Sequence, residues 1–542
     1  MKFKKINIVI AQNVEEFLFI KKNIKVEYLC IPVNLETLLH YEINKEKYIN
    51  PIFFLDNNFH KKGINTSHII EKSSKEKYIS DANLIFRFKL LVRYYYNACF
   101  FINELLKSIS NKYLLNKIIV SGWKLNNLDN PNKNYIITEI IEILYPKKVF
   151  RIKSEKKFKE IAKPFDYTIE KNYKFKNYIF YSNYGYNSYR IKNILKLNKA
   201  SKEVSIIKTE IPFWKKIIFS LKNIKLIELK KKISNEISQI IVKKINCDKI
   251  EPKILKAINN RLKFFNIDLN NIRNECHTLI NFFKNNPPKI FIFNLAQSLE
   301  RYCTREFSHK IKSIAIPHGT ISKSFNKFDK KYKKMIFQNI IQNRTDKLFL
   351  QSKIAEESLK DFKFKKNTKF LKKNIIFGNN KKNVKKNKKI LYAVTIKNLS
   401  SIQYYGVEMF YEYYSNLKFL NNLAQKKNLQ IVIKPHPTIH YLKDNLKNIF
   451  KNLEISTKNV SQLLNEVGVT ISFSSTVIED SINSSVPVIL LDRWKRYLHC
   501  RAETNYSKKN KAIYYVSDEN NLLRALNTID NSQKINFKEY VY

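Results

Sequence analysis

The chain has 542 residues, enough for two or three domains with their own hydrophobic cores. Hydrophobic residues make up 44% of it and aromatic residues 13%, which excludes a disordered or low-complexity chain. The formal net charge of +54 suggests a nucleic acid or an anionic membrane as partner. However, the positive charge is mostly scattered Lys in a chain with only 7 Gly, a pattern that a general drift in residue usage also produces. We therefore expect no specific nucleic-acid binding.

The cysteines and apolar segments indicate the compartment. No CxxC pair occurs among the 6 cysteines, so the sequence indicates neither a zinc site nor a disulfide framework, and a reducing compartment fits best. The most apolar stretch, from Leu84, is interrupted by Arg87, Lys89 and Arg93, short of the roughly 18–20 residues of a membrane span. The first twelve residues favour a strand over a signal peptide. We expect a cytoplasmic protein, soluble or peripheral on the inner face of the cell membrane.

The first part of the chain alternates short apolar runs with helical patterns. This alternation predicts a parallel α/β sheet. The expected strands begin at Ile6, Lys117, Asn177, Lys289, Lys312 and Asp346.

The stretch from Trp214 to Ile245 has a different pattern. Its apolar residues recur at helical spacing, Lys occupies the other face, and neither Gly nor Pro interrupts it. It predicts an amphipathic helix that either lies on an anionic membrane or packs on its own domain, and we favour packing. We expect a helical insertion around residues 211–285.

A second α/β series follows a run of Lys and Asn. Its expected strands begin at Lys389, Leu429, Gly468, Val486 and Ala512. We therefore predict an N-terminal Rossmann-like acceptor domain (1–378), a Lys/Asn-rich linker (379–389) and a C-terminal Rossmann-like nucleotide-donor domain (390–542). Two such sheets would face each other across a cleft, where α/β proteins bind ligands.

A histidine lies between two prolines in the stretch IVIKPHPT, Ile431 to Thr438. The β-branched run predicts a buried strand, and the prolines stiffen the loop behind it. His436 is then the most useful polar group of a rigid loop, although a solvent-facing His in an ordinary loop fits the same residues.

Hydroxyl side chains follow another expected strand, between Val469 and Asp492. Ser474, Ser475 and Thr476 precede a helix, and helix N-termini hold phosphate through unpaired backbone N–H groups. Glu479 falls in the first turn, where its carboxylate would accept hydrogen bonds from ribose. The alternative is a capping box between Thr476 and Glu479 that needs no ligand.

A third motif, IPHGT, spans Ile316 to Thr320. His318 follows an expected strand, and Gly319 allows a positive φ or a close ligand. Histidine suits acid–base chemistry near neutrality, but the motif also fits an ordinary turn.

Taken together, these motifs resemble GT-B glycosyltransferases of bacterial surface polysaccharide synthesis. That group includes CDP-glycerol glycerophosphotransferases, polysialyltransferases and capsule Kdo transferases. The resemblance covers roughly residues 289–526 and rests on the order of an HG loop, a KPHP loop and S-S-T-x-x-E before a PVI strand. It implies a GT-B-like α/β fold with two Rossmann-like parallel-sheet domains.

The resemblance also implies roles for single residues. The catalytic residues would be His436, at the donor phosphate, and His318, which would face the acceptor as a base or positioning group. The donor-binding residues would be Lys434, Ser474, Ser475, Thr476 and Glu479. Neither a metal site nor a cofactor is implied.

The chain departs from this family at three points. Asp480 stands where a small residue is usual, and Ser485 stands where Gly often precedes PVI. The first domain also lacks the acidic pair followed by Gly that sialyltransferases of this kind carry, which argues against a sialyl donor.

The predicted function is the transfer of a sugar or a glycerol-phosphate-like unit to a growing cell-surface glycan. The expected partners are a CMP-, CDP- or UDP-linked donor, a glycan or lipid-linked acceptor, and an anionic membrane surface. A UDP-sugar 2-epimerase shares the architecture and is one alternative. A basic nucleic-acid-binding protein, with steeply salt-dependent binding, is another.

Overall fold

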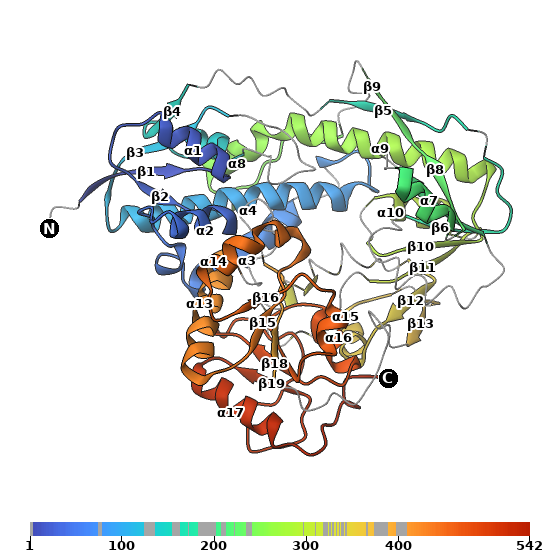
Figure 1. The fold of residues 1–542 in the computed structure, drawn as a ribbon. Helices are drawn as coiled ribbons and strands as arrows, with labels where there is room; N and C mark the ends of the chain where they lie inside the picture. Colours follow the sequence, from blue (N-terminus) through green and yellow to red (C-terminus); the bar gives the residue numbers. More distant parts are fainter. Residues whose placement is uncertain are drawn as a thin grey trace.

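The structure of the protein is a computed structural model. It describes residues 4–73, 78–123, 136–153, 163–171, 173–182, 202–207, 213–221, 223–234, 241–295, 298–308, 310–317, 324, 327, 330–331, 333–334, 337, 341, 344–364, 367–372, 388–396 and 409–542. Figure 1 shows three α/β units, two of them at the ends of long helices and the third below these helices.

The first unit is built on a four-stranded parallel sheet with the order β2-β1-β3-β4. Asn side chains begin its first two helices, because Asn13 accepts from the Glu16 amide and Asn34 from the Thr37 amide. Its elements are β1 (Lys5–Ile10), α1 (Val14–Lys22), β2 (Leu29–Ile31), α2 (Leu35–Ile43), η1 (Pro51–Phe53), α3 (Asn57–Ser73), α4 (Ile85–Ser110), β3 (Leu114–Ser121), α5 (Ile136–Leu144) and β4 (Val149–Ile152).

The second unit holds a seven-stranded parallel sheet with the order β13-β12-β11-β10-β6-β7-β8. Strands β6 to β8 are added in turn towards one edge of the sheet. Strand β10 then pairs with the other side of β6, and β11 to β13 continue towards the opposite edge, which is a doubly wound order. The strands are β6 (Tyr178–Tyr181), β7 (Lys202–Ile207), β8 (Ile224–Glu228), β10 (Ile290–Phe293), β11 (Lys312–Ala315), β12 (Lys347–Leu350) and β13 (Lys369–Lys372). The described helices are α7 (Phe213–Leu221), α8 (Pro252–Asn260), α9 (Leu262–Asn285), α10 (Leu299–Glu306), α12 (Lys353–Ser358) and η4 (Leu359–Asp361).

The third unit holds a six-stranded parallel sheet with the order β16-β15-β14-β17-β18-β19. The strands are β14 (Ile390–Tyr392), β15 (Ile431–Ile433), β16 (Glu454–Ile455), β17 (Val469–Ser472), β18 (Val488–Leu491) and β19 (Ile513–Val516). The helices are α13 (Phe410–Lys427), η6 (Pro437–Leu442), α14 (Lys443–Ile449), α15 (Val460–Leu464), α16 (Val477–Asn483) and α17 (Glu519–Asp530).

The predicted α/β class with two Rossmann-like parallel sheets is confirmed, and the first 152 residues add a parallel sheet that the prediction did not separate. Strands β13 and β14 belong to different sheets. Most of the predicted linker, residues 379–387, lies outside the described residues, so the domain boundaries stay a prediction.

The expected helix from Trp214 to Ile245 is wrong. Helix α7 ends at Leu221, and Asn223 then adopts a left-handed φ of 55°, which stops a helix. The next residues form strand β8, which extends the edge of the seven-stranded sheet, and β9 (Lys230–Ile233). Strand β9 pairs antiparallel with β5 (Phe165–Thr168). The expected insertion around 211–285 therefore contains α7, α8 and α9 but also two strands.

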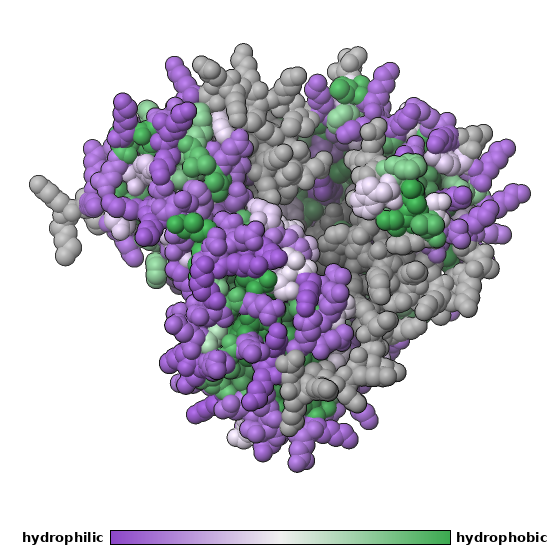
Figure 2. Space-filling model, in the orientation of Figure 1, coloured by the Kyte–Doolittle hydropathy of each residue, from purple (hydrophilic) through white to green (hydrophobic). Residues whose placement is uncertain are grey.

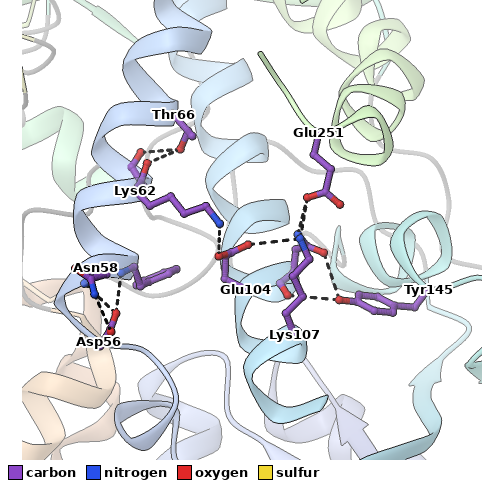
Figure 3. Close-up of polar contacts among 11 residues, drawn as sticks. Asp56, Asn58, Lys62, Thr66, Glu104, Lys107, Tyr145 and Glu251 are labelled. Carbon is purple, nitrogen blue, oxygen red and sulfur yellow. Dashed lines mark hydrogen bonds and ion pairs between the residues drawn. The ribbon is translucent and has the colours of Figure 1, made fainter. Parts of the chain in front are cut away.

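Helix α8 packs on the first unit through polar contacts (Figure 3). Lys107 of α4 reaches Glu251, directly before α8, at 3.0 Å, and Glu104 lies between Lys107 and Lys62 of α3. The connection between β8 and β10 of the seven-stranded sheet thus returns to the first unit and covers α4. No helix in the described part of the chain is long and apolar enough to cross a membrane.

Candidate functional site

The six-stranded sheet reverses its strand order between β14 and β17. Starting from β14, the next two strands (β15 and β16) are added towards one edge of the sheet. The last three (β17, β18 and β19) are then added towards the other edge. Ligands of open parallel sheets bind at the carboxyl ends of the strands where the order reverses. At this point the Ser472 hydroxyl donates to the Ala393 carbonyl oxygen at 2.6 Å, so the segments that leave β17 and β14 are held together.

The KPHP loop leaves β15 at the same edge. The Lys434 amide donates to the Tyr392 carbonyl oxygen at 2.9 Å, which fixes the start of the loop on β14. The Thr438 amide donates to His436 Nδ1 at 3.4 Å, and the Thr438 hydroxyl lies 2.8 Å from the same nitrogen. An amide can only donate, so Nδ1 is an acceptor and the neutral ring carries its proton on Nε2. Nε2 is therefore the protonated ring nitrogen of His436.

Lys434 is half-buried, and its Nζ lies 3.0 Å from Nε2 of His440 in η6. Burial lowers the pKa of the Lys434 ammonium. Burial and the Lys434 charge also lower the pKa of His440. Nε2 of His440 also lies 3.0 Å from the Pro435 carbonyl oxygen, so this ring sits between the Lys434 cation and the backbone of the KPHP loop. His440 was not predicted, although a second His four residues after His436 is visible in the sequence.

Ser474, Ser475 and Thr476 are half-exposed after β17. Strand β14 separates β15 from β17, so the two strands that carry the KPHP loop and this hydroxyl loop are roughly 10 Å apart, two strand spacings. The expected capping box is wrong, because Thr476 makes no side-chain cap bond. The Ser475 hydroxyl instead accepts from the Val477 amide at 3.3 Å, and Glu479 turns inward.

The Glu479 carboxylate is 2% exposed and lies 3.5 Å from Nε2 of His499. Neither of its oxygens accepts a hydrogen bond within the described structure. Buried carboxylates normally accept several hydrogen bonds, so this one has acceptor capacity to fill. His499 lies in the segment after β18, far from Glu479 in sequence, and no local pattern pointed to it.

Lys333, a residue of the second unit, packs beside this region. It is buried, and its Nζ lies 5.7 Å from the centre of the Tyr497 ring, which in turn lies 6.1 Å from the His499 ring. Burial raises the pKa of the Cys500 thiol. The charge of Glu479 raises this pKa further, and the charge of Lys333 lowers it. Lys333 is one of 100 basic residues, so no local pattern distinguishes it from the others.

A buried ion cluster fixes the segment that carries His499. Arg496 binds Glu412 of α13 through two bonds of 2.5 and 2.7 Å, and His60 of α3 lies 3.2 Å from the same carboxylate. Burial opposes ionisation of Glu412, but the charges of Arg496 and His60 outweigh it and lower its pKa to about 2. The cluster thus joins the first unit to the third.

Asp492 holds the start of the same segment. Its carboxylate accepts from the Arg496 amide at 2.6 Å and from the Tyr497 amide at 2.7 Å. Burial raises its pKa. Together, Glu412 and Asp492 set His499 beside Glu479.

His318 lies outside the described residues, so its predicted role stays a prediction. The strand before it, β11, ends at Ala315, and the Pro317 carbonyl oxygen accepts from Gln351 at 2.7 Å. In the described part of the chain, no group of three or more His, Cys, Asp or Glu side chains is arranged to hold a metal ion.

No protein family model matches the sequence, and neither does any curated protein. Among solved structures, the chain is similar to UDP-GlcNAc 2-epimerase from Methanocaldococcus jannaschii, with 13% identity, a TM-score of 0.36, and coverage of 67% of this chain and 96% of that one. It is similar to the glycosyltransferase of kitacinnamycin, with 10% identity, a TM-score of 0.35, and coverage of 66% and 91%. It is also similar to the wall teichoic acid polymerase TagF, with 13% identity, a TM-score of 0.33, and coverage of 65% and 80%. At these identities and TM-scores the likenesses carry no argument about activity.

Proposed function

We propose that the protein is a nucleotide-dependent glycosyltransferase that moves a sugar or a glycerol-phosphate-like unit to a growing cell-surface glycan. One observation carries the proposal. The six-stranded sheet reverses its order at β14 and β17, and the KPHP and hydroxyl loops both leave the carboxyl edge at that reversal.

The donor phosphate would lie between these two loops. His436 would donate from Nε2, Lys434 would supply a positive charge, and the hydroxyls of Ser474, Ser475 and Thr476 would complete the contacts from the other side. Lys434, His436 and Ser475 already make contacts that fix them, and fixed donors aimed at developing charge lower a barrier most effectively. The leaving nucleotide phosphate would thus be stabilised without a metal, and we expect transfer to persist in EDTA.

Glu479 would bind the ribose. Its buried carboxylate accepts no hydrogen bond from the described residues, and two ribose hydroxyls would fill this acceptor capacity. His499, 3.5 Å away, would orient the carboxylate.

The acceptor would approach from the second unit. His318 follows β11 of the seven-stranded sheet in sequence, and we keep its predicted role as base or positioning group. Lys333 comes from the same unit and would lie near the donor.

A melting-temperature screen with CMP, CDP, UDP and GDP tests the proposal, because a ligand that binds only the folded state raises the melting temperature. We expect one pyrimidine nucleotide to stabilise the protein. Its sugar or polyol conjugate should then label an added glycan acceptor. Conversion of a UDP-sugar without acceptor would instead favour a 2-epimerase. Salt-dependent binding of DNA or RNA with no nucleotide effect would contradict both.

A further inference from the structure

Helix α7 exposes an apolar face. Leu221 is 80% exposed, Phe213 77% and Trp214 57%, and Ile217 and Ile218 are also exposed. Figure 2 shows hydrophobic side chains gathered over α7 with hydrophilic ones beside them, at the right of the view.

The helix is amphipathic, but its apolar face points away from the protein. At about 100° per residue, these five side chains fall within an arc of roughly 140°. Phe219, which packs on the cluster of Ile179, Tyr181 and Ile224, lies on the opposite side. A surface helix normally turns its apolar stripe to the core, so the outward face of α7 indicates a partner.

The surroundings of this face are strongly basic. Lys216 of α7 and Lys171 share one carboxylate, Glu228, at 3.1 and 3.8 Å. Strand β9 presents Lys230, Lys231 and Lys232, all exposed. The described segments 163–171, 173–182, 213–221 and 223–234 hold ten Lys against Asp166, Glu170 and Glu228.

We propose that α7 and β9 form a docking surface for an anionic lipid bilayer. We call it the α7 surface, made of Phe213, Trp214, Ile217, Ile218 and Leu221 with Lys230, Lys231 and Lys232. An apolar helix face with Lys on the same helix and on the neighbouring segments has the composition of helices that lie in a membrane interface. The apolar face enters the headgroup region, and the lysines contact anionic headgroups.

The positive charge around α7 favours an anionic bilayer over a second copy of the chain. A second copy of the chain would place one Lys-rich surface against another, and like charges oppose such an interface. A nucleic acid would use the lysines but not the apolar face. The proposal is independent of the transfer reaction, since the α7 surface shares no residue with the nucleotide site.

Co-sedimentation of the full chain with vesicles tests the proposal. We expect binding to vesicles of phosphatidylcholine with phosphatidylglycerol, little binding to phosphatidylcholine alone, and release at high salt, where screening shortens to about 3 Å. The double variant Ile217→Asp, Leu221→Asp should reduce vesicle binding by about tenfold or more. Both side chains are exposed, so the fold and the melting shift with nucleotide should not change.

The matched control is Phe53→Asp, which alters a side chain that is 74% exposed on η1 of the first unit. It should bind vesicles like the unaltered protein. Trp214 fluorescence should shift to the blue on anionic vesicles, and Trp214→Phe should remove the shift. No binding to anionic vesicles at low salt, or equal binding by the double variant, would overturn the proposal. A dimer in sedimentation velocity that the double variant abolishes would assign the face to a second copy instead.

Discussion

Replacing Glu412 by Gln tests the ion cluster that positions His499. Glu412 has a pKa of about 2 in the folded protein against an ordinary value of 4.5. A difference of roughly 2.5 pH units corresponds to about 3 kcal/mol of folding stability. Because the folded pKa is lowered, this stability is fully present above about pH 5 and is lost as the pH falls towards about 2.

At neutral pH, Glu412→Gln should cost about 3–5 kcal/mol, because Arg496 stays buried without its counter-charge. Between about pH 5 and 2, the difference from the unaltered protein should shrink by about 3 kcal/mol. Asp492, whose pKa is raised by burial, titrates in both proteins, so subtracting the two curves removes its contribution.

The assay is urea unfolding at a series of pH values, followed by tryptophan fluorescence, to which Trp494 contributes with its ring 5.5 Å from the Arg496 guanidinium. The control is Glu454→Gln, which removes a carboxylate that is 50% exposed and paired with Lys389 at 3.3 Å. It should change stability by less than about 1 kcal/mol. A difference between the Glu412→Gln and unaltered curves that stays constant from pH 7 to about pH 2 would refute the reasoning.

Three further predictions concern the donor site. His436→Ala should abolish transfer with an unchanged melting temperature, because the ring is half-buried on a loop and contributes little core; wild-type turnover would exclude His436. Ser475→Ala should weaken donor binding and cost about 1 kcal/mol of stability, because its hydroxyl also accepts from the Val477 amide; urea unfolding separates the two effects. Glu479→Gln should weaken a nucleoside diphosphate but not inorganic pyrophosphate, since only the former carries ribose; equal weakening of both would contradict the ribose assignment.

Most strands could be predicted from the sequence because buried parallel strands read as short β-branched runs. The runs at Ile6, Ile290, Ile431 and Val488 all became strands. Strand β8 was missed because Ile, Leu and Lys also fit helical spacing in that stretch. The left-handed Asn223 decides against the helix, and its φ is not visible in sequence.

The site could be predicted only where its residues are close in sequence. Lys434, His436 and the hydroxyls follow strands directly, so their place at the sheet edge follows from strand direction. His499 and Lys333 reach the region through tertiary packing, which no local pattern encodes. The expected capping box did not form because Thr476 has helical backbone angles, φ −63° and ψ −14°, whereas a capping residue has extended ones.

Calorimetric titration of the stabilising nucleotide into Lys434→Met tests the central claim most directly, that the donor binds where β14, β15 and β17 end. The matched control is Lys426→Met, which alters an exposed Lys of α13 paired with Glu519 at 3.3 Å. The account predicts that Lys434→Met weakens binding by about tenfold or more, or about 1.4 kcal/mol, and that Lys426→Met leaves the Kd unchanged. Equal Kd values for both variants and the unaltered protein, or no nucleotide binding at all, would contradict it.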